Sequence, residues 1–228
     1  MQRDLTTGNI TGNLLKFAFP LMVGNLLQQF YNVADTWIVG QFLGADALAA
    51  VGSSYTLMVF LTSILLGLCM GSGAAFSIQY GKKDFEHLKC SMFLSFGLIA
   101  GITLILNIAV FWGLDGIVWI LQVPREITGL MKEYLWVIFW GIAATFLYNY
   151  FANLLRAVGN SVVPLVFLGI SAILNIVLDL AFVLFFHWGV RGAAIATVFS
   201  QFVSGIGILI YTWKRFPSLR IARRHMRW

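Results

Sequence analysis

Long apolar segments alternate with short polar connections along nearly the whole chain. A membrane-spanning helix needs about 20 predominantly apolar residues, and each segment reaches that length. The pattern therefore predicts an all-α integral membrane protein whose six transmembrane helices form one bundle within residues 1–213, followed by a basic tail at 214–228. The expected spans cover residues 14–40, 48–80, 90–112, 127–155, 162–186 and 193–213.

Glycines four residues apart recur in two of these spans. Gly67 and Gly71 form one pair, and Gly97 and Gly101 form another. Small residues at this spacing let transmembrane backbones approach closely, so both pairs are predicted to lie at contacts between helices. The stretch 113–122, which follows the third span and contains tryptophan, is expected at the membrane–water interface.

The composition agrees with a membrane protein and excludes an ordinary soluble domain. Hydrophobic residues make up 60% of the 228 residues, charged residues make up 11%, and the mean hydropathy is +0.86. Soluble domains carry roughly 25% charged residues. Cys69 and Cys90 offer neither a disulfide framework nor a metal-ligand spacing, and both are expected to be packing residues.

Lysine and arginine are distributed unevenly between the two sets of span ends. Only Arg125, Lys132 and Arg191 lie at one set, and the remainder of the 15 basic residues lie at the other set or in the tail. By the positive-inside rule, both termini are predicted to be cytoplasmic in a multi-pass protein of the plasma (inner) membrane. This asymmetry, with the tail beside anionic lipid, explains the net charge of +6, so no nucleic-acid partner is expected.

Two carboxylates are predicted to lie inside the membrane. Asp35 falls about 20 residues into the first span, roughly 30 Å of helix, and Asp179 falls at a similar depth in the fifth span, which runs in the same direction. An Asp at mid-span costs about 2.5–3.5 kcal/mol on insertion scales, and such a residue normally binds or relays something. The similar depth of the two residues predicts one shared polar cavity.

Polar side chains at helical spacing accompany the two carboxylates. Residues four or seven apart share one face of a helix, so several spans present a polar stripe. An alternative holds for each amide or hydroxyl alone, because such groups often only join helices, at about 0.6 kcal/mol per hydrogen bond. The candidates are Gln28, Tyr31 and Asn32 near Asp35, Asn149, Asn153 and Tyr148 on the fourth span, Asn175 near Asp179, and Thr197, Ser200 and Gln201 on the sixth.

The two carboxylates together can hold a proton, Na⁺ or an organic cation in turn. Loss of hydration and mutual repulsion both disfavour two ionised groups in one cavity, and no Lys or Arg lies at matching depth to neutralise them. The sequence therefore predicts a cation-exchange site at Asp35 and Asp179 with H⁺ or Na⁺ as the coupling ion. No cofactor and no resident metal are expected.

Pro20 lies early in the first span, where it removes a backbone hydrogen bond and is expected to kink the helix. Two interpretations remain open. The kink is either a hinge for the helix that carries Asp35 or a static bend held by neighbouring helices.

Five short motifs occur in order along the chain. Asp35 lies in NVADTWIVGQFLGADALAAVG, and Asp179 lies in NIVLDLAFV. The second span is followed by YGKKD, the fourth is followed by LLRAVGNSVVP, and the sixth begins with GVRGAAIAT. Together they resemble the N-terminal lobe of the multidrug and toxic compound extrusion (MATE) family over nearly the whole chain. The resemblance implies one lobe of a twelve-helix antiporter that exports cationic or amphipathic compounds in exchange for H⁺ or Na⁺.

The resemblance also implies roles for individual residues. Pro20 matches the first-helix proline whose bending is proposed to accompany protonation, whereas Leu180 departs from the proline that the family often has after the aspartate. The matching polar residues are Asp35 and Asp179 as ion-coupling carboxylates, Asn175 and Thr197 in the network around them, and, less closely, Asn149 and Asn153.

The chain has about half the length of the family's two-lobe transporters, so half of the expected cavity wall would come from a second lobe or a second copy. A truncated or split product is the favoured explanation. Two alternatives are a non-transporting half that oligomerises with or regulates a full-length partner, and a lipid-linked precursor flippase, whose basic cavity these spans lack. An intramembrane enzyme is disfavoured because His87, His187 and His225 all lie at span ends.

Overall fold

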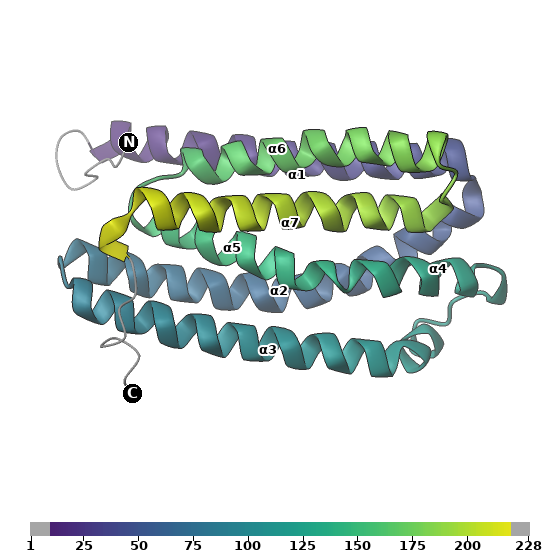
Figure 1. The fold of residues 1–228 in the computed structure, drawn as a ribbon, viewed down its shortest axis with the longest axis horizontal. Helices are drawn as coiled ribbons and strands as arrows, with labels where there is room; N and C mark the ends of the chain where they lie inside the picture. Colours follow the sequence, from purple (N-terminus) through teal and green to yellow (C-terminus); the bar gives the residue numbers. More distant parts are fainter. Residues whose placement is uncertain (1–9, 220–228) are drawn as a thin grey trace.

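The computed structural model describes residues 10–219, and every regular element in that range is a helix. The prediction of an all-α fold is therefore confirmed for this range (Figure 1). Residues 1–9 and 220–228, which include most of the predicted basic tail, lie outside it. The elements are α1 Ile10–Leu43, α2 Ala45–Gly81, α3 Phe85–Ile120, α4 Arg125–Ile138, α5 Gly141–Ala157, α6 Val162–Leu180, a π-helical turn Ala181–Phe185, α7 Gly189–Arg215 and a 3-10 turn Pro217–Leu219.

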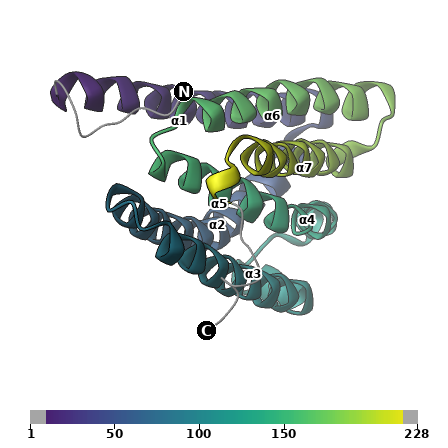
Figure 2. The ribbon, with the colours of Figure 1, turned by 60° about the vertical axis from the view of Figure 1, so that its left-hand side comes forward.

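The helices run along the long axis of the bundle and form layers (Figures 1 and 2). α1 and α6 lie side by side in one outer layer, α7 and α5 lie in the middle, and α2 and α3 form the opposite side. α7 packs most extensively, against both α5 and α6, and is the central helix. The start of α1 and the end of α7 lie at the same end of the bundle, so the chain enters and leaves the bundle on one side.

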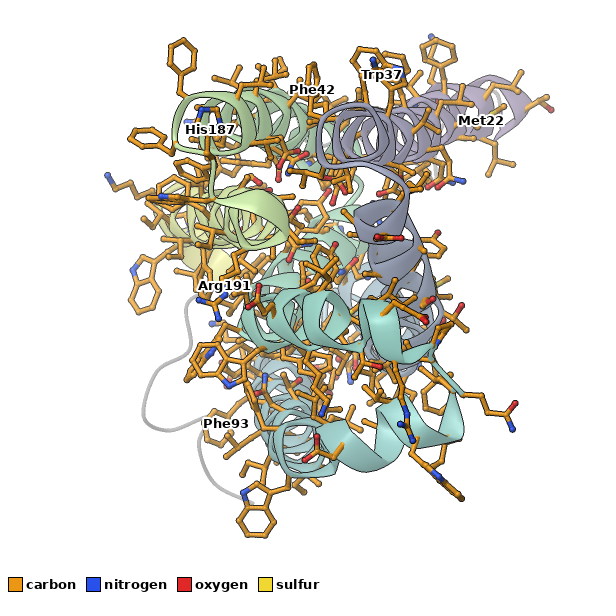
Figure 3. The ribbon with its side chains drawn as sticks, turned by 90° about the vertical axis from the view of Figure 1, so that its right-hand side faces the viewer. Met22, Trp37, Phe42, Phe93, His187 and Arg191 are labelled. Atoms are coloured by element: carbon orange, nitrogen blue, oxygen red, sulfur yellow. The ribbon has the colours of Figure 1, made fainter. Side chains whose placement is uncertain are left out.

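Large apolar side chains cover much of the outside of the bundle. Trp37 and Phe42 project from α1 away from the other helices in Figure 3, and they are 61% and 44% exposed. Soluble monomers rarely expose apolar surface on this scale. The bundle therefore has the surface that a surrounding bilayer requires.

Four elements of the described chain are long and apolar enough to cross a membrane, namely α2, α3, α6 with its π-helical turn, and α7. α4 and α5 make a fifth if they are counted as one bent span. α1 has sufficient length, with 34 residues, but amides such as Gln28, Gln29 and Asn32 leave it no stretch as apolar as those of the other spans. Of the six predicted spans, five are thus long and apolar enough to cross a membrane if the bent pair counts as one. The remaining span, α1, carries Asp35.

The span predicted at 127–155 is not one continuous helix. α4 ends at Ile138, α5 begins at Gly141, and the two helices are bent by 46° relative to each other. A break leaves backbone carbonyls without helical donors, and Asn107 of α3 donates from its Nδ2 to the Phe139 carbonyl at 2.8 Å. Apolar residues continue through the break, so the hydrophobic pattern alone did not reveal it.

The third predicted span has different boundaries, and the fifth has the predicted extent but is not one regular α-helix. Most of the stretch 113–122 belongs to α3, which continues to Ile120. The fifth span changes geometry directly after Leu180, where α6 gives way to the π-helical turn, and the Phe186 N–H donates to the Ala181 carbonyl at 3.1 Å. π-Helical turns are frequent at functional sites, and this one begins two residues after Asp179.

The glycines at close helix contacts are not the ones that were predicted. An added Cβ at Gly205 of α7 would lie 2.9 Å from the Ala144 carbonyl oxygen of α5, so these two backbones touch. Sequence spacing places two glycines on one face but does not say which face meets a neighbour. The predicted pairs, in contrast, have nothing within 4 Å of their Cβ positions: Gly67 and Gly71, Gly97 and Gly101.

Asp84 caps the start of α3 in the connection from α2. Its Oδ1 accepts a hydrogen bond from the His87 backbone N–H at 3.2 Å, and its Oδ2 lies 2.8 Å from His87 Nδ1. These hydrogen bonds from His87 hold the pKa of Asp84 below its ordinary value. The ionised carboxylate therefore stabilises the fold above the unfolded-state pKa of about 3.9. This contribution is lost as the pH falls through the lower pKa of the folded state.

Replacing Asp84 by alanine is expected to fray the first turn of α3 at neutral pH, because the turn loses its capping oxygen. Amide hydrogen exchange at residues 85–88 should be faster in Asp84→Ala than in the wild type near neutral pH. The difference should shrink only as the pH falls below about 3.9 and through the lower pKa of folded Asp84, because the wild-type carboxylate is then protonated. Asp84→Asn retains a capping oxygen and is the matched control. Equal exchange in Asp84→Ala and the wild type at neutral pH would contradict the capping role.

Candidate functional site

Asp35 of α1 and Asp179 of α6 come together in the structure. The two helices pack side by side, and the two carboxyl groups approach closely enough for a hydrogen bond between them. Asp179 has no exposed surface, and Asp35 is half-buried with its Oδ1 fully enclosed. The two predicted carboxylates therefore occupy one buried polar site, which we call the carboxyl pair.

No hydrogen bond or ion pair from the described residues compensates the charge of the carboxyl pair in this structure. Asp35 Oδ1 and both oxygens of Asp179 accept no hydrogen bond, and neither residue takes part in an ion pair formed by residues 10–219. An uncompensated buried ion costs about several kcal/mol, and two such ions in contact cost more. Because carboxylates only accept hydrogen bonds, the pair can form one only when it carries a proton. The site therefore favours uptake of a cation.

Asn175 lies one helical turn before Asp179 on the same face of α6. Its Nδ2 donates to Thr197 Oγ1 of α7 at 3.1 Å, and both side chains are buried. The oxygen of the same amide, Asn175 Oδ1, is buried and accepts no hydrogen bond. α1 and α6 thus contribute four buried oxygens that lack donors, and oxygen is the ligand type that hard cations prefer. No group of three acidic, histidine or cysteine side chains that would hold a resident metal occurs in the described part of the chain.

Two tyrosines lie close to the carboxyl pair, Tyr31 of α1 and Tyr134 of α4. The Tyr31 phenol also interacts with the side chain of Gln201 on α7 and lies near Tyr55 of α2. Five helices, α1, α2, α4, α6 and α7, therefore contribute polar groups to the site.

Tyr134 and Tyr55 were missed by the sequence analysis. Tyr134 follows Ile127 and Met131 on the buried face of α4, so its spacing is that of any core residue. Tyr55 lies on an exposed face of α2. The only signal that could have found Tyr134 is a phenol on an otherwise apolar face, because a buried tyrosine hydroxyl needs a partner.

Asn149 and Asn153 were predicted to line the cavity, but the structure gives them other contacts. Asn149 Nδ2 donates to the Thr145 carbonyl at 2.8 Å, and Asn153 Nδ2 donates to the Asn149 carbonyl at 2.9 Å, so both bonds remain within α5. Asn153 also packs against Gly73 of α2. Neither hydrogen bond reaches another helix or the carboxyl pair, and the role of Asn149 and Asn153 in lining the cavity stays a prediction.

Gln28 and Asn32 share the helical face of Asp35 but lie toward the outside of the bundle. Gln28 is exposed, and Asn32 is half-buried, with its Nδ2 bonded to Gln29 Oε1 at 3.3 Å. Polar side chains on an outer face of α1 do not suit a hydrocarbon environment. This part of the α1 surface therefore needs a polar or protein neighbour.

Pro20 lies within α1, which continues as a single helix on both sides of it. A hollow of about 680 Å³ adjoins this part of α1 and the connection between α5 and α6, and its lining includes Lys16, Pro20 and Ser161. The hollow does not include the carboxyl pair. Pro20 and Asp35 are about four helical turns apart, so any influence of one on the other passes along α1.

An all-helical membrane bundle that encloses an uncompensated carboxyl pair is typical of ion-coupled membrane transporters. The MatE family model matches residues 20–181, which is more than half of the chain. The chain therefore belongs to the MatE family, whose members are transporters and not enzymes. This confirms the resemblance that the five sequence motifs indicated.

Similar proteins match this chain with only part of their own length. The probable multidrug resistance protein YpnP of Bacillus subtilis is 33% identical over 211 residues, covering 92% of this chain and 47% of YpnP. Two crystal structures of MATE proteins, described as bent and straight conformations, each give a TM-score of 0.88 at 27% and 26% identity, covering 95% and 96% of this chain and 48% of each of theirs. The chain spans about half the length of the curated relatives it matches.

Proposed function

We propose that this chain is one lobe of a secondary antiporter that exports cationic or amphipathic compounds in exchange for H⁺ or Na⁺. The observation that carries the proposal is the set of buried oxygens of Asp35, Asp179 and Asn175 that lack donors. Relatives named as multidrug resistance and multidrug export proteins support the class of substrate.

The proposed exchange follows from the charge of the carboxyl pair. When a proton or Na⁺ occupies the site, Asp35 and Asp179 repel each other less. When that ion leaves, two unpaired carboxylates remain, and their combined charge attracts an organic cation. Because one monovalent cation replaces another, the cycle moves no net charge, and the ion gradient drives it without help from the membrane potential.

A second lobe, from a partner chain or a second copy of this one, completes the cavity in this proposal. We place the assembly in the plasma membrane with both termini cytoplasmic, as the distribution of lysine and arginine predicts. The exposed amide of Gln28 and the half-buried amide of Asn32 then face the second lobe, which is the polar neighbour that this surface of α1 needs.

Pro20 is proposed as the hinge of α1. A proline lacks the N–H that would bond to the carbonyl four residues earlier, here that of Lys16, so α1 can bend there with little loss of hydrogen bonding. The solved MATE structures described as bent and straight support this role.

The proposal is tested by flux of a fluorescent cationic dye in lipid vesicles that contain the purified chain. One set of vesicles carries a pH gradient at equal Na⁺, and the other carries a Na⁺ gradient at equal pH. Dye movement against its own gradient in one set only would support the proposal and identify the coupling ion. A folded chain that moves no dye under either gradient would contradict transport by this chain and would favour a half that only assembles with a partner.

A further inference from the structure

We propose that Gln201 of α7 is a positioning residue that orients the Tyr31 hydroxyl toward the carboxyl pair. The inference rests on the proposed function, because it concerns how the pair loses its proton. It is carried by the contacts that hold the two ends of the Gln201 amide, one on α5 and the other on α1.

The oxygen end of the Gln201 amide is fixed on α5. Thr145 Oγ1 lies 3.0 Å from Gln201 Oε1, and the same hydroxyl lies 3.1 Å from the Gly141 carbonyl. Gly141 itself leaves room for the amide, because an added Cβ would lie 3.0 Å from Gln201 Oε1. A larger residue at this position, directly after the break that follows α4, would displace the amide.

The nitrogen end of the amide points the other way as a consequence. With Oε1 held on α5, the Gln201 amino group is available to the Tyr31 phenol on α1, with which it interacts. An amino group can only donate to the phenol oxygen. The phenol hydrogen of Tyr31 is then free for a nearby acceptor, and both Asp35 and Asp179 lie close to this ring.

The series of side chains from Thr145 through Gln201 to Tyr31 therefore provides a hydrogen-bond donor for the carboxyl pair once the pair is ionised. In this structure no described residue donates a hydrogen bond to Asp35 Oδ1 or to either oxygen of Asp179, so these acceptors are available to the Tyr31 hydroxyl. The remaining titratable groups near the pair are Tyr134 of α4 and, beside Tyr31, Tyr55 of α2. A hydrogen bond to an ionised carboxylate favours the ionised form, so removing the Gln201 amide should make release of the proton harder.

The test is an infrared titration of protonated carboxyl groups in the purified full chain in lipid nanodiscs, which needs no transport. Asp179→Asn identifies the signal of the carboxyl pair. In Gln201→Met, which has similar volume but no amide, the pH at which this signal is half lost should rise by about one unit, as expected for one hydrogen bond to a charged group. Thr145→Val should shift it in the same direction by less.

A double variant separates positioning from a merely structural effect. In a Tyr31→Phe background, Gln201→Met should cause no further shift, because the hydroxyl that it positions is absent. A wild-type midpoint in folded Gln201→Met, or an undiminished shift in the Tyr31→Phe background, would overturn the inference. If the wild type shows no titrating signal that Asp179→Asn removes, the proposed ion-exchange role of the pair fails instead.

Discussion

Replacing Asp179 by asparagine is expected to abolish gradient-driven dye flux without lowering the stability of the fold. Asp179 is fully buried, and its two oxygens accept no hydrogen bond from the described residues. The substitution removes a charge that the fold does not compensate, so the unfolding temperature should stay the same or rise. Flux should fall to the level of empty vesicles, because a neutral amide cannot exchange a proton for another cation. Dye flux and thermal unfolding measured on the same preparation check both parts.

Asp35→Asn should behave in the same way, since Asp35 is the other member of the carboxyl pair. Asp115→Asn is the matched control, because Asp115 is an exposed carboxylate that pairs with Lys132. It should leave flux close to the wild-type level. A stable Asp179→Asn variant that still moves dye under a gradient would refute the role of the pair, whereas an unfolded variant would show that Asp179 is structural.

Substituting Gly205 by leucine is expected to be the most damaging single change in the packing of the lobe. A Cβ at this position would lie 2.9 Å from the Ala144 carbonyl oxygen and 3.3 Å from Leu147 Cβ. The clash is with the backbone of α5, which cannot move aside as a flexible side chain would. Overpacking of this kind costs about 1–3 kcal/mol, and we expect the upper end of that range. Unfolding of the purified chain by increasing denaturing detergent measures the loss.

Gly101→Leu is the matched control for this packing prediction. Gly101 is exposed on α3, and nothing lies within 4 Å of its Cβ position. A leucine there adds apolar surface on the outside of the bundle and should change the unfolding free energy little. Equal destabilisation by Gly205→Leu and Gly101→Leu would mean that the cost comes from the helix backbone and not from the contact between α5 and α7.

The elements that were predicted well are those that a local pattern determines. Apolar runs bounded by charged connections placed α2, α6 and α7 close to their observed bounds. The helical spacing of Asn175 and Asp179 predicted that they share one face of the helix, and both are buried on α6. We inferred that Asp35 meets Asp179 from their similar depth in the membrane alone. In the structure, the packing of α1 on α6 brings the two residues together.

The features that were not predicted depend on contacts between distant segments. The break after Ile138 is accompanied by a hydrogen bond from Asn107, 32 residues earlier than Phe139, and no local signal in α4 announces it. The glycine pairs failed for a related reason, because a small residue marks a contact only if a neighbour is present. The spacing of Asn149 and Asn153 also did not indicate that the Nδ2 of each would bond to a backbone carbonyl within α5.

The pairing of α1 with α6 has a consequence for the order in which the protein can be assembled. α1 precedes the other described helices in the chain, and it is the long helix least able to enter lipid on apolarity alone. Its principal packing partner, α6, follows only after most of the lobe has been made. Until α6 is made, α1 has mainly α2 to pack against. The pairing of α1 with α6 is consequently a late step in the assembly of the lobe, and it joins helices that lie far apart in the sequence.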